Sequence, residues 1–188
     1  RASAEKYEKI WTEEGSPLVV ITASLERRLN DYYAERGLPV VVRAGMSYGK
    51  PSLKQAVKEL KEEGCTELVV LPMYPQSAFS TTGSVSDGVA KAVRRARFKG
   101  DMRLIDGYGE DPTYVRAVAA SIRNAGFSED AGDRLLFSFH SIPLKDIEAG
   151  DTYELQTGAT SLAVAGELGL DRRSWTISYQ SRFDKGRT

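Results

Sequence analysis

The sequence predicts an α/β fold, with doubly wound parallel sheets that carry helices on both faces. Two observations lead to this fold class. Helical and strand-like segments alternate along the chain, and no two strand-like segments lie close enough in sequence to form a hairpin. A strand that is followed by a helix and another strand normally joins a parallel sheet through a right-handed crossover. With 188 residues, of which 41% are hydrophobic, the chain can bury a substantial core.

Five segments have the apolar spacing and the end signals of helices. Ser16 and Pro17 suit the start of the first, and Ser52 and Gln55 are expected to form a capping box at the start of the second, which Gly64 ends. A later helix starts with the pair Asp-Pro and ends at a glycine in the same manner. The expected helices span residues 16–36, 52–64, 84–97, 111–126 and 152–168.

Five apolar segments between these helices are expected to be strands. They are LPVVVRAGM (38–46), ELVVLP (67–72), MRLIDGY (102–108), RLLFSF (134–139) and SWTISYQ (174–180). The β-branched run at 38–46 is typical of a parallel strand covered on both faces. Because the chain opens on a helix and closes just after a strand, we expect elements of the fold to precede Arg1 and to follow Thr188.

The polar stretch FSEDAGD, residues 127–133, is the predicted joint between two parts of the chain. Residues 1–126 are then a first α/β half that lacks its initial strand. Residues 134–188 are the beginning of a second α/β half, and they contain the only histidine of the chain.

Charge and cysteine content exclude several classes of protein. The 26 basic residues balance 26 acidic ones, which argues against nucleic-acid binding and against polybasic attachment to a membrane. No run approaches the roughly 18 apolar residues of a membrane helix, and no signal peptide is recognisable. The single cysteine, Cys65, excludes an internal disulfide framework and favours a cytoplasmic protein. We expect Cys65 to be a small buried residue.

Polar and aromatic side chains gather where the predicted strands end. Ligands of open parallel sheets bind beyond the carboxyl ends of the strands. Tyr, Ser, Thr, Gln and Gly are abundant there and net charge is low, which suits a large, flat, partly apolar ligand with a few polar groups. These ends read MSYGKPS (46–52), PMYPQSAFSTTGS (72–84), DGYGED (106–111), FHSIP (139–143) and YQSRF (179–183).

The loop from Met73 to Gly83 is long for a connection between a strand and a helix, and such length often accompanies function. Ser80, Thr81 and Thr82 directly precede the next helix. Their hydroxyl groups could cap that helix, or its free backbone N–H groups could bind a carboxylate or a phosphate. The loop lacks both G-x-x-x-x-G-K-[ST] and G-x-G-x-x-G, so a nucleotide is not indicated.

His140 follows the strand LLFSF directly and precedes a Ser-Ile-Pro turn. A neutral imidazole at the carboxyl end of a strand can accept a proton near pH 7 or bind a divalent metal. No second His and no Cys is near it in sequence, so a metal would need ligands from elsewhere. The absence of G-x-S-x-G argues against a serine hydrolase.

Five motifs in order resemble those of the ferrochelatase family, whose members insert ferrous iron into a porphyrin. The motifs are IWTEEGSPL, GMSYGKPSL, LPMYPQSAFSTTGS, SFHSIP with GDTY, and ISYQSRF. The resemblance covers essentially the whole chain and implies two similar Rossmann-like halves with the porphyrin between them. The family's opening strand and its later E-T-L-E-like motif, which supplies a carboxylate facing the histidine, are not in this sequence. We therefore expect these 188 residues alone to be inactive.

The resemblance also implies roles for individual residues. His140 matches the catalytic histidine, acting as a base or as the last iron ligand. The implied porphyrin-binding residues are Tyr48, Tyr74, Ser80, Thr81, Gln180, Ser181 and Arg182. Ser47 stands where many members have arginine, and the residues after QSRF depart from the family pattern. Phe79 stands where animal members have a cysteine ligand of an iron–sulfur cluster.

The expected substrates are ferrous iron and either protoporphyrin IX or coproporphyrin III. The expected enzyme is a lyase-type metal chelatase that needs no cofactor from this chain and binds no nucleic acid. An iron–sulfur cluster outside this chain, peripheral membrane contact and the oligomeric state are left open. The alternatives are a chelatase for cobalt or sirohaem, a non-catalytic porphyrin or haem carrier, and an unrelated α/β enzyme that binds a phosphorylated metabolite at the STTG loop.

Overall fold

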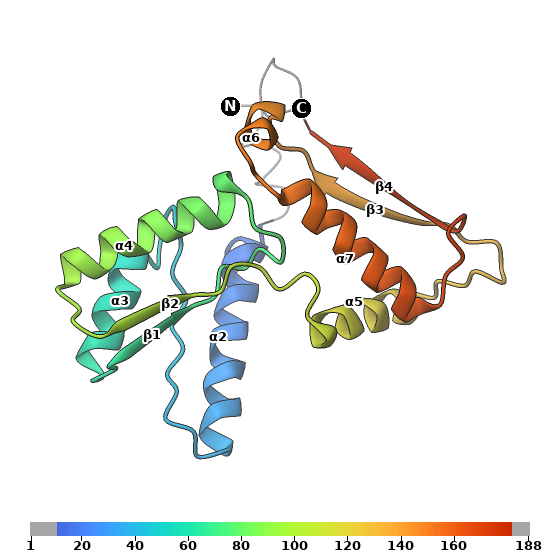
Figure 1. Ribbon diagram of the computed structural model, residues 1–188. Coiled ribbons are helices and arrows are strands. Elements are labelled where there is room, and N and C mark those ends of the chain that lie inside the picture. Colours follow the sequence, from blue (N-terminus) through green and yellow to red (C-terminus); the bar gives the residue numbers. More distant parts are fainter. Residues whose placement is uncertain (1–10, 182–188) are drawn as a thin grey trace. The chain divides into compact units, whose positions relative to one another are not determined.

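The computed structural model describes residues 11–181, which form helices and two small sheets (Figure 1). The helices are α2 (Pro17–Glu35), α3 (Leu53–Glu62), α4 (Ser84–Ala96), α5 (Pro112–Asn124), α6 (Leu144–Glu148) and α7 (Tyr153–Leu168), with a π-helical turn η1 (Phe79–Gly83). The strands are β1 (Glu67–Val70), β2 (Asp101–Leu104), β3 (Leu135–His140) and β4 (Trp175–Gln180). The mixed α/β class is therefore confirmed.

The chain divides into two compact units. The first contains the described residues up to Leu68 together with Asp87–Arg103, and the second contains Val69–Ser86 and the described residues from Leu104 onward. The predicted halves on either side of residues 127–133 are a different division, which stays a prediction. Within the described ranges, no helix combines the length and the apolar character that crossing a membrane requires.

Strands β1 and β2 pair in parallel. The N–H group of Asp101 donates to the carbonyl of Thr66 at 3.2 Å, and that of Ile105 donates to the carbonyl of Val70 at 2.9 Å. Both bonds have the same offset in sequence, which is the pattern of a parallel pair joined by a crossover through α4. Both strands are shorter than the segments expected at 67–72 and 102–108.

Strands β3 and β4 also pair in parallel, from Leu135 opposite Trp175 to His140 opposite Gln180. Helix α7 packs on β4 and against α5, all within the second unit (Figure 1). Along β3 the side chains alternate between partly buried and exposed, and His140 belongs to the exposed set. Because neighbouring side chains of a strand point to opposite faces, the histidine lies on the face away from the partly buried residues.

The core of the first unit lies between α3, α4 and the β1–β2 sheet. Val57, Leu68, Ala92 and Phe98 are buried there, and apolar residues of both helices pack around them. Burying a side chain of the size of Val, Leu or Phe contributes about 1.5–3 kcal/mol. The amphipathic patterns that predicted α3 and α4 therefore correspond to one shared core.

The helix starts agree with their sequence signals, with one correction. The side-chain oxygens of Ser16, Ser52 and Asp111 accept hydrogen bonds from the first turns of α2, α3 and α5. The predicted capping box at Ser52 is only half formed. The side chain of Gln55 donates to Glu59 Oε1 at 2.9 Å, one turn further along the helix, instead of returning to Ser52.

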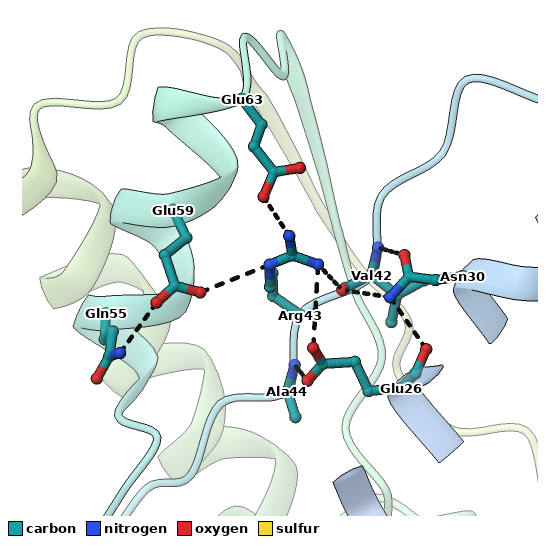
Figure 2. A network of polar contacts seen from close by, with 8 residues as sticks. All are labelled: Glu26, Asn30, Val42, Arg43, Ala44, Gln55, Glu59 and Glu63. Atoms are coloured by element: carbon teal, nitrogen blue, oxygen red, sulfur yellow. Dashed lines mark hydrogen bonds and ion pairs between the residues drawn. The ribbon is translucent and has the colours of Figure 1, made fainter. Parts of the chain in front are cut away.

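The strand expected at 38–46 is not formed, because no strand among the described residues lies beside it. Only Met46 makes an isolated parallel bridge, to Ser52. Side chains of α2 take the place of a partner strand (Figure 2). Asn30 accepts from the N–H of Val42 at 2.8 Å and donates to its carbonyl at 3.0 Å, and Glu26 accepts from the N–H of Ala44 at 2.8 Å.

Arg43, in the same segment, joins α2 to α3. Figure 2 shows its guanidinium between Glu26 of α2 and Glu59 and Glu63 on the α3 side. The nitrogen–oxygen distances are 3.9 Å to Glu26 and 3.5 Å to Glu59, and Glu63 accepts a hydrogen bond from Nη2. These side chains are partly exposed, so each pair contributes about 1 kcal/mol or less.

The replacement of a strand by the Asn30 side chain predicts a large effect of Asn30→Ala. This change leaves the N–H of Val42 without its partner, whereas the Val42 carbonyl keeps the hydrogen bond from Arg43 Nη1 at 2.8 Å. We expect a loss of about 1–3 kcal/mol in the free energy of unfolding. Asn124→Ala, at the exposed end of α5, is the matched control and should cost less than about 0.5 kcal/mol. Denaturant unfolding of the two variants measures the difference, and equal losses would contradict this account of the 38–46 segment.

Candidate functional site

The candidate site lies where β3 and β4 end in the second unit. His140 and Gln180 are the last residues of these strands and face each other in register. Beyond them, the N–H of Ser141 donates to the carbonyl of Gln180 at 2.9 Å, and the Ser141 hydroxyl donates to the carbonyl of Ser181. Ser181 has a left-handed backbone, with φ of 64°, so the chain turns sharply where it leaves β4. These bonds hold the two strand ends together beside the imidazole.

One contact of the His140 ring fixes its tautomer. Nδ1 lies 2.7 Å from the carbonyl oxygen of Ser141. A carbonyl oxygen only accepts hydrogen bonds, so Nδ1 carries the proton, and the lone pair of the neutral ring is on Nε2. Donation from the other ring nitrogen to a carbonyl is also the arrangement that orients histidines and raises their basicity at metal sites. In the neutral ring, Nε2 is therefore the nitrogen with the lone pair that acid–base or metal chemistry uses.

The loop between β1 and α4 is anchored by helix α7. The buried side chain of Gln76 donates to Thr160 Oγ1 at 2.9 Å. Gln156 Oε1 accepts from the N–H of Ser77 at 2.8 Å. Both partners are on α7, so side chains rather than a strand satisfy the backbone and polar groups of this loop. The loop is thereby held against the helix that covers the β3–β4 sheet.

Asp151 connects the same loop to the start of α7. It is only 7% exposed. One carboxylate oxygen accepts from the N–H of Phe79 at 2.7 Å, and the other accepts from the N–H of Tyr153 at 2.9 Å. Both N–H groups open a helical segment, where backbone donors lack partners and negative charge is stabilising. A single carboxylate therefore fixes both segments.

This arrangement corrects the expectation that hydroxyl groups cap the helix after the loop. Ala78 holds the cap position of η1 and makes no side-chain hydrogen bond there. The Thr81 hydroxyl donates back to the carbonyl of Ala78, and the buried Thr82 hydroxyl makes no hydrogen bond with any residue of the described part. The carboxylate that the loop was expected to accommodate is supplied by Asp151, because that side chain is already buried beside the Phe79 N–H.

Two tyrosines and a threonine form a polar cluster on the α7 side of the sheet. The Thr157 hydroxyl donates to the carbonyl of Glu154 at 2.8 Å, so the contact of 2.6 Å with Tyr179 has the tyrosine as donor. Burial raises the pKa of Tyr153, and the neighbouring Tyr179 and Asp151 raise it further. The Tyr153 phenol is therefore protonated at neutral pH, so it adds no negative charge beside that of Asp151. The hydrogen bond from Tyr179 to Thr157 joins β4 to α7.

The structure brings some of the predicted site residues together and separates others. His140, Gln180 and Ser181 meet at the strand ends. Tyr74, which is 44% exposed, lies with Ser80 and Thr81 in the same unit, on the loop that α7 anchors. Two predicted residues are not placed with them. Tyr48 belongs to the first unit and is 90% exposed, and Arg182 lies outside the described residues.

Sequence reasoning missed the residues that hold the loop. For Asp151 a signal existed, because GDTY places an acidic residue just before a helix. Gln76 and Gln156 have no such signal, since their partners are about 80 positions away, at separations of 84 and 79 residues. Between residues 11 and 181, no three His, Cys, Asp or Glu side chains gather in a way that could hold a metal ion.

A histidine exposed at the end of parallel strands, in a unit that also contains a long loop anchored by a helix, is typical of α/β proteins that bind and transform a ligand at the carboxyl edge of a sheet. The comparisons with known proteins name the family. A family model described as Ferrochelatase matches residues 1–187, and the chain belongs to the ferrochelatase family.

Curated relatives support this assignment. The chain is 41% identical over 182 residues to the ferrochelatase of Aeromonas hydrophila subsp. hydrophila, covering 97% of this chain and 56% of that protein. It is 40% identical over 186 residues to the ferrochelatase of Thioalkalivibrio sulfidiphilus, covering 98% and 50%. It is 39% identical over 185 residues to that of Methylibium petroleiphilum, covering 98% and 51%. The chain thus spans about half the length of these relatives.

The double role of the Asp151 carboxylate predicts that Asp151→Asn destabilises the second unit. An amide offers one acceptor oxygen and an N–H₂ group, so one of the two backbone donors loses its partner, at a cost of about 1–3 kcal/mol. Asp106→Asn, the same change at an exposed residue of this unit, should cost less than about 0.5 kcal/mol. Hydrogen exchange should also become faster at the amides of Phe79 and Tyr153. Unchanged exchange at both amides would contradict the bridging role.

Proposed function

We propose that this chain provides the histidine-bearing part of a lyase-type metal chelatase that inserts ferrous iron into protoporphyrin IX or coproporphyrin III. Membership of the ferrochelatase family supports the reaction. The observation that carries the proposal is the position of His140, exposed at the end of β3 with Nδ1 bonded to the Ser141 carbonyl. That bond leaves the lone pair of the neutral ring on Nε2, which is the atom that the reaction needs.

The reaction exchanges two protons for one metal ion. The porphyrin loses both N–H protons, Fe²⁺ takes four ring nitrogens as ligands, and the two protons leave through bases. His140 Nε2 acts either as the acceptor of one of these protons or as the last iron ligand before transfer. One nitrogen cannot hold a proton and an iron ion at the same time, so Nε2 can have only one of these two roles at any step of the reaction.

The remaining predicted residues would bind the porphyrin. In this proposal Tyr48 and Tyr74 contact the ring, and Gln180 and Ser181 form part of the rim. The propionates are held by Arg182, or by Ser80 and Thr81, with an arginine favoured for bidentate geometry. The anchoring of the loop by Gln76, Gln156 and Asp151 supports a rigid contact surface. A rigid site that binds a buckled ring better than a flat one lowers the barrier to insertion.

The finer features of the fold and setting belong to the same proposal. We infer two similar doubly wound halves, and the parallel pairing of both small sheets supports this arrangement. We also infer that the chain needs no resident cofactor, with iron as a substrate, and that the protein works in the cytoplasm. The single cysteine among 188 residues supports a reducing compartment.

The proposal predicts that His140→Ala, made in the whole protein, abolishes metal insertion. Because His140 acts on the ring centre, porphyrin affinity should stay within about tenfold of the unchanged protein, or about 1.4 kcal/mol. The measurement is the rate of Fe²⁺ insertion under anaerobic conditions, with Zn²⁺ and Co²⁺ tested in parallel, monitored by the change in porphyrin absorbance. Ser138→Ala, on the same exposed face of β3, is the control and should retain turnover.

The outcome that removes His140 from the chemistry is substantial turnover by the alanine variant. A preference for Co²⁺ over Fe²⁺ in the unchanged protein would instead favour a different chelatase. If the unchanged protein inserts none of the three metals but binds porphyrin tightly, the protein is a carrier.

A further inference from the structure

A second candidate site lies in the first unit, apart from the histidine. An open pocket of about 430 Å³ is formed where the end of α3 meets the segment between α4 and β2. Its lining is more apolar than polar and includes Phe98 and Cys65, and its cationic lining residues are Lys61, Arg97 and Lys99. The volume is in the range of small-molecule sites. Cys65 is partly exposed here, which corrects the expectation of a buried residue.

The cations that line this pocket make no ion pair within the described residues, although the acidic residues Glu67 and Asp101 directly follow the lining residues Thr66 and Gly100. Between residues 88 and 100 the chain has five Lys or Arg residues and no Asp or Glu. In the part of the chain that the structure describes, the side chains of Arg97 and Lys99 make neither an ion pair nor a hydrogen bond. Lys61 donates only to the carbonyl of Ala96, at 2.9 Å. The nearby carboxylates of Glu62 and Glu63 are engaged by Lys58 and Arg43. The chain is neutral overall, so this is a local positive excess.

Arg97 occupies a position at which glycine would be more stable. Its φ is 52°, in the left-handed region, directly after the end of α4. The N–H of Phe98 returns to the carbonyl of Val93 at 3.1 Å, which completes the helix-ending motif that normally has glycine at this point. A side chain here costs backbone free energy. An arginine at such a strained position suggests that its guanidinium has a function.

Gly100 gives the pocket its shape. A Cβ atom at this position would lie 1.9 Å from the carbonyl oxygen of Thr66 and 2.6 Å from the Phe98 ring. The chain at Gly100 therefore approaches the backbone just before β1 at a distance that only glycine permits. Arg97 and Lys99, on either side of the buried Phe98, line the pocket together with Gly100.

We propose that this pocket binds a small organic phosphate, whose phosphate group contacts Arg97 and Lys99 and whose apolar part lies against Phe98 and Cys65. Several cations at one mouth match the charge of a phosphate dianion, and an arginine can bind two of its oxygens at once. The apolar part of the lining favours a ligand that has an apolar group in addition to its phosphate. This site is independent of the function proposed for His140.

Phenyl phosphate is a suitable probe, because it combines a phosphate dianion with one apolar ring. It should shift the amide NMR signals of residues 97–100 with a Kd below about 1 mM. Cys65, the only cysteine of the sequence, serves as a reporter: its alkylation by iodoacetamide should slow severalfold when the probe is bound. Phenol, which lacks the charge, should not protect the thiol, and inorganic phosphate should bind at least tenfold more weakly.

The decisive variant is Arg97→Gly, which relieves the left-handed strain and removes the cation. Its midpoint of thermal unfolding should rise while its affinity for phenyl phosphate falls at least tenfold. Lys99→Gln, at a position without backbone strain, should weaken binding severalfold without that rise. Arg95→Gln, an exposed cation that does not line the pocket, should bind within twofold of the unchanged chain. Unchanged affinity in both Arg97→Gly and Lys99→Gln, equal protection by phenol, or no shift with phenyl phosphate would overturn the proposal.

Discussion

The carboxylate of Asp151 is the contact on which the candidate site in the second unit depends. It is buried and accepts the first N–H groups of two segments, at Phe79 and at Tyr153. The first backbone donors of a helical segment have no partner within that segment, and the Asp151 carboxylate supplies one to each. The first unit solves the same problem with Asn30 and Glu26, which satisfy the backbone of the segment expected to be a strand. In both units, side chains therefore satisfy backbone groups that have no partner in a helix or a sheet.

Local signals predicted the elements whose causes are local. Helix α5 begins at Asp111 and Pro112 and is followed by Gly126, whose φ is 87°, and each of these residues acts where it stands in the sequence. The run at 38–46 has the composition of a strand, yet a strand also needs a partner, and pairing is not encoded in the run itself. Because no neighbouring strand is present among the described residues, the 38–46 segment does not form the expected strand, although its residues are typical of one.

The site divides in the same way. His140 could be located from its place after an apolar run, because a residue at that point must lie at the edge of the sheet. The anchoring of the loop could not be predicted from the sequence, since Asp151 and Phe79 are 72 residues apart and meet only when the second unit is folded. The family motifs supplied the roles of the remaining residues, and these motifs reflect a common ancestry that composition and periodicity do not contain.

The Ser141 carbonyl holds the proton of the neutral His140 ring on Nδ1 and so leaves the lone pair on Nε2. The chain has one histidine, so ¹⁵N NMR of the imidazole reports on this residue without ambiguity. The account predicts, for the neutral ring, a protonated Nδ1 and an unprotonated, pyridine-like Nε2. A neutral ring with its proton on Nε2 would contradict it, because the nitrogen assigned to the chemistry would then have no lone pair.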